Sequence, residues 1–282
     1  MLTLYKSYCK LKLFPNELFC LDIIRRLLMK FLVVTDLHYS DKPAGDNNRY
    51  HFMSLDKVRA AIERYSDGCD FVACFGDVVD SFNGYKSQTQ LLSEMRAMLD
   101  GFDIPFYTTF GNHDTALDKN EFIRLIGMPG RYYSFESSGY LFLMLDSCMN
   151  SKDVPYPEKE IKWTQCFVDD EQLAWMKDKI AKSDLPVVVM THALLAGDED
   201  HTIINADEIT DILYEYEDKI AAAFCGHYHD GLHSKLGSIP YIAFKALCMG
   251  ETLTCAVVEI EETLVNITGY GDEPSVQIKK EK

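Results

Sequence analysis

The residues of this chain that could perform chemistry follow a series of apolar, β-rich segments. The segment "VVTDLHYS" (33–40) runs into Asp36 and His38, and alternation along an extended strand would point both side chains to the same side. Four later segments also end in residues that can bind a metal ion or transfer a proton. They contribute Asp77 and Asp80 from "FGDVVD", Asn112, His113 and Asp114 from "FGNHD", His192 from "VVVMTHA", and His227 and His229 from "FCGHYHDG". One such fragment is typical of a surface turn, but folding does not require a ligand-type ending after every core strand.

These donors are expected to converge, because open α/β sheets place their sites at the carboxyl ends of strands. Burying several carboxylates and imidazoles together is unfavourable unless positive charge lies between them, and a pair of divalent metal ions supplies that charge. Oxygen and nitrogen donors without thiolates suit Mn, Fe, Zn, Ni or Co better than Mg or Ca alone. The histidines away from these strand ends, His51, His201 and His233, are expected to be solvated or structural.

Alternating strands and helices must position these residues. The apolar runs predict strands at 31–35, 70–75, 105–110, 140–146, 186–191 and 220–225. Helical spacing covers 55–65, 173–180 and 209–216, and Asp169 with Gln172 three residues on predicts a helix start. This alternation predicts an α/β fold with layered packing in one domain. After residue 230 only short strands are expected, at 241–244, 254–260 and 264–270, and we expect them to complete a second sheet.

Composition limits the classes of protein. The chain has 282 residues and a formal net charge of −16, which argues against a nucleic-acid-binding protein because such proteins need a basic surface. The nine cysteines are scattered without a C-x-x-C pair, so we expect a reducing, cytoplasmic compartment, no disulfide framework and no cysteine-based zinc site. No apolar stretch is long enough to cross a bilayer, so no membrane partner is expected.

The two ends of the chain are expected to lie outside the main domain. Residues 1–28 are interpreted as an N-terminal extension or a mis-assigned start, since "MKFLVVTDLHYS" begins at Met29; a membrane-contacting amphipathic helix over 18–28 is the alternative. The domain itself is predicted to span 29–272, and residues 273–282 are predicted to form a frayed tail.

Together, the motifs D-x-H, G-D-x-x-D, G-N-H-D, a single His and G-H-x-H resemble the calcineurin-like metallophosphoesterase superfamily from about residue 31 to about residue 260. The resemblance implies an α/β fold in which a two-sheet αββα sandwich holds two divalent metal ions. By position, it implies that the first ion is bound by Asp36, His38, Asp77 and His229, and the second by Asp77, Asn112, His192 and His227. His113 would act as a catalytic residue that approaches the leaving-group or transition-state oxygens, with Asp114 orienting its ring.

This resemblance predicts a metal-dependent phosphoric ester hydrolase, either a phosphatase or a phosphodiesterase. Two metal ions about 3.5–4 Å apart suit an in-line displacement at phosphorus by a metal-bridging hydroxide. Asp80 and Asp114 are candidate hydrogen-bond acceptors for the histidine rings. The expected substrate is a small, nucleotide-like phosphomonoester, phosphodiester or diphosphate, and the oligomeric state is left open.

A finer resemblance points to one branch of the superfamily. The segments "HYSD…NNRYHFMSLDKVRAAIERY", "YYSFESSGYLFLMLDS", "DDEQLAWMKDKI" and "CGHYHDGLHSKLGSIPYIAFKAL" resemble manganese-dependent ADP-ribose/CDP-alcohol diphosphatases, although that branch often has Gln where this chain has His38. Substrate choice would lie in the loops beyond the strand ends. The candidate base-stacking aromatics there are Tyr39, Tyr50, Tyr85, Tyr156 and Trp163, and the candidate phosphate-binding cations are Arg49 and Lys86.

Two alternatives remain open at this stage. A non-catalytic scaffold with the same fold would be expected to lose metal ligands, and every motif here is intact. A protein Ser/Thr phosphatase would need arginines near the metal ions, and the strand-end motifs contain none.

Overall fold

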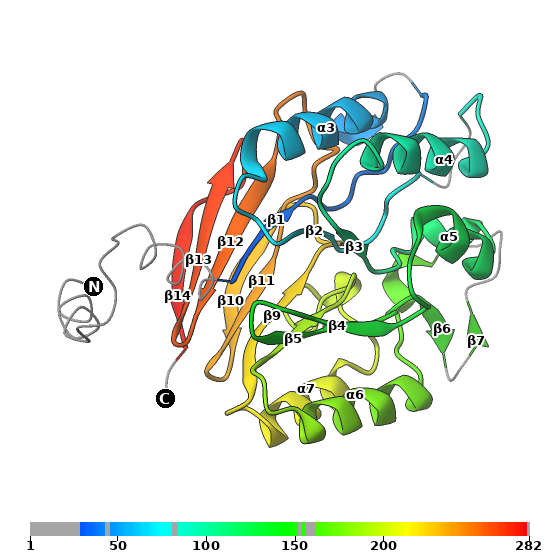
Figure 1. Ribbon diagram of the computed structural model, residues 1–282. Helices are drawn as coiled ribbons and strands as arrows, with labels where there is room; N and C mark the ends of the chain where they lie inside the picture. The colour runs from blue at the N-terminus through cyan, green and yellow to red at the C-terminus, as the bar shows by residue number, and fades with distance from the viewer. Residues whose placement is uncertain (1–28, 43–45, 81–83, 152–153, 156–161, 281–282) are drawn as a thin grey trace, which may run out of the picture.

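A computed structural model describes residues 29–42, 46–80, 84–151, 154–155 and 162–280 of this chain. Two six-stranded sheets pack face to face, and helices cover the outer side of each one (Figure 1). This is the two-sheet αββα sandwich that the resemblance predicted. Both sheets turn the carboxyl ends of their parallel strands toward the loops that carry the candidate site residues.

The first sheet has the strand order β14-β13-β12-β1-β2-β3. Its strands are β1 (Met29–Val33), β2 (Phe71–Cys74), β3 (Phe106–Thr108), β12 (Cys255–Glu261), β13 (Leu264–Tyr270) and β14 (Val276–Lys279). β1 is parallel to β2 and antiparallel to β12, so Phe31 pairs with Phe71 on one side and with Val258 on the other. The parallel half of the sheet is the half that delivers the motifs containing Asp36, Asp77 and Asn112.

The second sheet has the strand order β10-β11-β9-β8-β5-β4. Its strands are β4 (Tyr133–Ser137), β5 (Tyr140–Met144), β8 (Val187–Met190), β9 (Ile220–Cys225), β10 (Leu232–Leu236) and β11 (Ile239–Ala243). β5, β8, β9 and β11 are mutually parallel. A two-stranded ribbon is formed separately by β6 (Met149–Ser151) and β7 (Val154–Pro155).

Two groups of helices cover the sandwich (Figure 1). The α-helices are α3 (Ser54–Tyr65), α4 (Gln88–Leu99), α5 (Lys119–Ile126), α6 (Asp170–Lys182) and α7 (Ala206–Glu215). The 3₁₀ helices are η1 (Asp46–Asn48), η2 (His51–Met53), η3 (His113–Ala116), η4 (Trp163–Gln165) and η5 (Glu199–His201). The predicted helix start is confirmed, because the Asp169 side chain accepts a hydrogen bond from the Gln172 backbone N–H at the first turn of α6.

Alternation along the buried strands explains how the layers hold together. On β5, Phe142 and Met144 belong to the core between the two sheets. Leu141 and Leu143 on the same strand instead pack in the core that α6 and α7 cover. Aromatic rings join the two sheets directly, because the Phe142 ring lies 5.1 Å from the Phe71 ring on β2. A strand buried on both faces explains the unbroken apolar runs in the sequence.

Two predictions about the C-terminal region are wrong. The strands β12 and β13 were expected to complete a second sheet, but β12 pairs with β1 and extends the first sheet. The tail at 273–282 was expected to fray, but residues 276–279 form β14 and pair with β13 from Ile267↔Val276 to Leu264↔Lys279. The tail is ordered because its backbone forms hydrogen bonds with the open edge of the sheet. Backbone hydrogen bonds do not depend on apolar side chains, so the sequence shows little hydrophobic pattern there.

Some predictions concern residues outside the described part of the chain. The extension at 1–28 and Tyr156 both belong to this set. Within the described residues, no helix combines the length and apolar character needed to cross a membrane.

Candidate metal centre

The strand-end turns that carry the site residues have an unusual backbone. Asp36, His38, Asp77 and His227 all have positive φ, between 43° and 66°. This left-handed region is costly for residues with a Cβ atom, although Asp and His enter it more readily than β-branched residues. Such strain is commonly found at functional sites. Here it turns each chain sharply at the end of a strand and directs its polar side chains to one edge of the sandwich.

Two glycines allow the turns to approach one another. A Cβ atom on Gly226 would overlap the Asp36 carboxylate and lie 2.7 Å from the Thr35 hydroxyl oxygen. A Cβ atom on Gly111 would overlap the backbone nitrogen and the carboxylate of Asp77. The glycine that precedes the ligand-type residues in these two motifs is therefore required by the close contact between adjacent strand ends.

Asp77 lies at the middle of the converging side chains. Its Oδ2 atom lies 3.3 Å from His38 Nε2 and 3.5 Å from His192 Nε2. Its Oδ1 atom accepts a hydrogen bond from the His113 backbone N–H at 2.8 Å. One buried carboxylate oxygen thus faces two histidines from different sheets, with a separate group of donors on each side.

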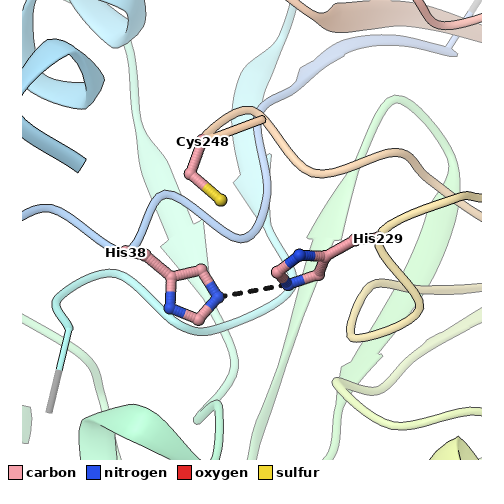
Figure 2. A group of neighbouring side chains, drawn as sticks. All are labelled: His38, His229 and Cys248. Carbon is pink, nitrogen blue, oxygen red and sulfur yellow. Dashed lines mark hydrogen bonds between the residues drawn. The ribbon is translucent and has the colours of Figure 1, made fainter. Parts of the chain in front are cut away.

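The first group contains Asp36, His38 and His229. The His38 and His229 Nε2 atoms lie 3.2 Å apart, and His229 Nε2 lies 3.6 Å from Asp36 Oδ1. The Asp36 carboxylate is held by the Thr35 hydroxyl, which donates at 2.9 Å, and by the His227 backbone N–H at 3.1 Å. The Sγ atom of Cys248 lies beside these two histidines (Figure 2).

The second group contains Asn112, His192 and His227. His192 Nδ1 donates to the Phe75 carbonyl oxygen at 2.6 Å, so its Nε2 presents a lone pair, and this lone pair faces Asn112 Oδ1 at 3.0 Å. His227 Nε2 donates to the Trp163 carbonyl oxygen at 3.1 Å, which leaves Nδ1 as the acceptor. Hydrogen bonds on the outer ring nitrogen orient histidine ligands in metal sites in this way.

Protonation preferences agree with this arrangement. Burial lowers the pKa of His38 to about 4, and it also lowers the pKa of His192, His227 and His229. Burial and the neighbouring Asp77 carboxylate raise the pKa of Asp36 well above its ordinary value. Burial also acts to raise the pKa of Asp77, but the surrounding histidines outweigh it and hold that pKa low. Burial therefore disfavours the charged form of these four histidines and of Asp36.

The side chains fit divalent metal ions. Within the described residues, the buried Asn112 amide nitrogen has no hydrogen-bond partner while its oxygen faces the His192 lone pair. Lone pairs that face one another are unfavourable in a buried space unless a cation lies between them. Three overlapping groups have donor atoms within 4.8 Å of one another: His38, Asp77 and His113; Asp77, His192 and His227; and His38, His229 and Cys248.

Comparison with known proteins identifies the family. The sequence profile described as calcineurin-like phosphoesterase matches residues 29–231. The chain belongs to the calcineurin-like phosphoesterase family. Membership makes it a metal-dependent phosphoric ester hydrolase, and the enzyme class that the motifs predicted is confirmed.

Individual relatives agree with this family. The human manganese-dependent ADP-ribose/CDP-alcohol diphosphatase is 22% identical over 284 residues, which cover 78% of this chain and 82% of the human protein. A probable glycerophosphodiester phosphodiesterase from Arcobacter nitrofigilis is 29% identical over 173 residues, covering 57% of this chain and 56% of that protein.

Solved structures share the fold of this phosphoesterase. A dimetal phosphatase from Danio rerio has a TM-score of 0.77 at 18% identity and covers 90% of this chain and 99% of that one. GAP50, the anchor in the inner membrane complex of Plasmodium, has a TM-score of 0.61 at 14% identity and covers 91% of this chain and 90% of that one. At these identities the likeness establishes the fold alone.

The contacts of His113 in this phosphoesterase differ from the prediction. His113 Nδ1 lies 2.9 Å from Asp80 Oδ1, so Asp80 holds the ring. Asp114 was expected to do this, but its oxygens accept hydrogen bonds from the backbone N–H groups of Gly111 at 2.9 Å and Val79 at 3.1 Å. Asp114 therefore fastens two strand-end loops together. The same Asp80 oxygen lies 3.7 Å from His38 Nδ1, which is too long for a hydrogen bond.

The predicted rim residues have different environments. Tyr39 is buried, and its hydroxyl donates to Glu94 at 2.7 Å, so it is a structural residue. Lys86 pairs with the same Glu94 at 2.6 Å, and the Tyr85 side chain is 95% exposed. The Tyr50 ring lies 6.4 Å from the Phe52 ring.

Among the candidate aromatics that the structure describes, Trp163 is the one whose ring lies beside a ligand of the centre. Its ring lies 6.1 Å from the His227 ring and 4.8 Å from the His201 ring, and 41% of the residue is exposed.

The remaining histidines have local partners. His51 is buried and donates from Nδ1 to the His38 carbonyl oxygen at 2.9 Å, so it supports the turn that carries His38. His233 pairs with Glu273 at 2.9 Å. His201 pairs with Asp198 at 2.6 Å and lies beside Trp163. These contacts agree with the structural or solvated roles expected from the sequence.

Proposed function

We propose that this phosphoesterase hydrolyses a phosphate ester or diphosphate bond of a small, nucleotide-linked substrate, using two divalent cations. Asp36, His38, Asp77 and His229 would hold one cation, and Asp77, Asn112, His192 and His227 the other. The observation that carries this proposal is the position of Asp77 Oδ2, which lies within 3.5 Å of one histidine from each group. An anionic oxygen in that position suits a ligand shared by two ions.

When bound, the cations would polarise the phosphoryl oxygens and lower the pKa of water at the centre to near neutral. The chain supplies the positioning. Asp77 and the outer-ring hydrogen bonds of His192 and His227 fix the ligand atoms. Since Nδ1 of His113 faces Asp80, its other ring nitrogen would be the one that meets a leaving-group oxygen. The His113 side chain is 12% exposed, against 1% for His38, so His113 is the more accessible of the two to a substrate.

A nucleotide-like substrate is supported by the rim. The partly exposed Trp163 ring beside the centre offers a surface on which a base can stack. Burial is the largest influence on the pKa values of Asp36, His38 and His229. The positive charge of the Arg49 guanidinium acts, more weakly, to lower all three pKa values, so this charge is felt at the first group. Arg49 would meet a second phosphate. The human relative acts on ADP-ribose and CDP-alcohols, which combine a base with a diphosphate.

Hydrolysis assays with added Mn²⁺ test this proposal. We expect turnover of ADP-ribose or CDP-alcohols to exceed that of p-nitrophenyl phosphate, bis-p-nitrophenyl phosphate and a cyclic nucleotide. Asp77→Asn should lose activity because it removes the shared ligand, and His113→Ala should lose about 10²–10⁴-fold, the usual contribution of a general acid–base group. Asp207→Asn, a carboxylate in the first turn of α7, is the matched control and should retain full activity. Equal, low rates on all substrates would remove the nucleotide preference.

A scaffold role predicts a different result. The similarity to GAP50 concerns the fold alone, at 14% identity. A scaffold would show no metal-dependent turnover in the wild-type chain, and Asp77→Asn would make no difference. The convergence of the candidate ligands at one buried centre favours the enzyme.

A further inference from the structure

Within the described residues, one cysteine lies at the candidate metal centre. Cys248 follows β11 and is fully buried. Its Sγ atom and the ring nitrogens of His38 and His229 all lie within 4.8 Å of one another. Figure 2 shows the thiol directed toward the space between the two rings, and the dashed line joins their Nε2 atoms. The thiol thus faces the same space as the donors of the first group.

Backbone hydrogen bonds fix Cys248 to the strand end that carries Asp36. The Cys248 N–H donates to the Asp36 carbonyl oxygen at 3.2 Å, and the preceding Leu247 N–H donates to the Thr35 carbonyl oxygen at 2.9 Å. On the other side, the Cys248 carbonyl oxygen accepts from the Tyr50 N–H at 2.8 Å. The thiol and the Asp36 carboxylate are therefore held in register by direct backbone contact.

Lys57 of α3 strengthens this attachment. Its Nζ atom donates to the carbonyl oxygens of Leu247 at 3.0 Å and Gly250 at 2.8 Å, which flank Cys248 in the sequence. Lys57 itself is buried. Hydrogen bonds from this one ammonium group to carbonyl oxygens on both sides of Cys248 tie the loop that carries the thiol to α3.

Other buried cysteines have ordinary protein contacts. Cys225 Sγ lies 3.4 Å from the Tyr241 hydroxyl, and Cys74 Sγ lies 3.5 Å from the Gly76 carbonyl oxygen. Cys248 differs because its neighbours are ring nitrogens of candidate metal ligands. Thiolates favour softer ions than carboxylates do.

We propose that Cys248 is a further protein ligand of the cation held by Asp36, His38, Asp77 and His229, and that it makes this position prefer Zn²⁺ or Co²⁺ over Mn²⁺. This inference rests on the proposed function, because it requires that centre to bind metal. On ligation the S–H bond breaks, a sulfur–metal bond forms and the proton passes to solvent; no oxidant or reductant takes part. The expectation of oxygen and nitrogen donors without thiolates would then be wrong.

A cobalt titration of the metal-free full-length chain tests the ligand. Wild type and the matched control Cys255→Ser should show visible d–d bands and a thiolate-to-cobalt charge-transfer band in the near ultraviolet. Cys255 is a suitable control because it is buried on β12 and, within the described residues, belongs to none of the candidate metal-binding groups. Cys248→Ser and Cys248→Ala should keep the d–d bands and lose the charge-transfer band.

Two other results would overturn one or both proposals. Charge-transfer bands of equal strength in wild type and both Cys248 variants would overturn the proposal and leave the proposed function intact. Absence of d–d bands from the wild-type chain would overturn both. Using two variants guards against misfolding, since alanine avoids burying the serine hydroxyl.

Competition between Zn²⁺ and Mn²⁺ tests the selectivity. The ratio of Zn²⁺ to Mn²⁺ affinity at the first position should fall by about tenfold or more in Cys248→Ser, equivalent to at least about 1.4 kcal/mol. An unchanged ratio would show that the thiol does not select the ion and would overturn that part of the proposal.

Discussion

The floor of the candidate centre and its rim are built differently. The floor consists of strand-end residues such as Asp77 and His192, which are almost completely buried and fixed by contacts between adjacent turns. The rim is built from the connections between strands: Trp163 lies beside His227 and is 41% exposed, and the predicted rim residue Tyr85 is 95% exposed. Core packing therefore dictates where the metal donors lie, whereas the groups available for substrate choice are placed by loops that the core does not constrain.

One Asp–His pair in the floor and one at the rim allow the two regions to be compared directly. In the floor, Asp80 and His113 lie 2.9 Å apart with side chains 4% and 12% exposed. At the rim, Asp198 and His201 lie 2.6 Å apart with side chains 42% and 24% exposed. At similar distances, the electrostatic interaction of the floor pair should be the stronger one, because water screens the rim pair and hardly reaches the floor pair.

The largest expected effect comes from the shared carboxylate. Asp77→Asn should lower kcat/KM by about a thousandfold or more, because metal-ion stabilisation of a transition state is worth several kcal/mol and about 1.4 kcal/mol corresponds to tenfold. Steady-state kinetics with saturating Mn²⁺ measures this loss. A variant within tenfold of wild type would mean that the two groups of donors do not share Asp77.

A smaller loss is expected when the floor pair is broken. Asp80→Asn should lower kcat by about 10–100-fold with little change in KM, because outer hydrogen bonds to functional histidines are typically worth that much. Asp198→Asn at the rim should keep kcat within about twofold. Similar losses in both variants would remove the distinction between floor and rim.

Loss of the rim aromatic should affect binding more than chemistry. Trp163→Ala should raise KM for a CDP-alcohol by at least about fivefold, since stacking of one base is worth about 1–3 kcal/mol. Its KM for a glycerophosphodiester, which lacks a base, should not change. Tyr85→Ala is the exposed control, and an equal rise of KM for both substrates in Trp163→Ala would argue against base stacking.

The smallest effect is expected at Lys86. Its ion pair with Glu94 is partly exposed on both sides, so Lys86→Ala should change the free energy of unfolding by less than about 1 kcal/mol. Its kcat/KM should stay near the wild-type value. A strong rise of KM for diphosphates would instead give Lys86 the phosphate-binding role that the sequence suggested.

Sequence reasoning found the floor because strand order brings Asp36, Asp77, Asn112, His192 and His229 to one edge. Alternation along an extended strand does not position Asp36 and His38, which lie beyond β1 in turns of positive φ. It could not decide which carboxylate holds His113, since Asp80 and Asp114 differ only in how their turns close. It missed β14, because this strand forms through pairing with β13 and the pattern of its own sequence does not predict it.

Cys248 was overlooked for a similar reason. It belongs to the run "FKALCMGE", which looks like a core segment with no ligand-type residue at the end of a strand. The signal that could have revealed it is its place just after β11, on the edge where β9 delivers His227 and His229. Pairing of β11 with β9 becomes apparent only in three dimensions.

The central claim is that two divalent cations share Asp77 at the buried centre. Calorimetric titration of the metal-free chain with Mn²⁺ tests it most directly. The account predicts two ions per chain in wild type, and one or none in Asp77→Asn. A wild-type chain that binds a single ion, or none, while hydrolysing its substrate at full rate would contradict it.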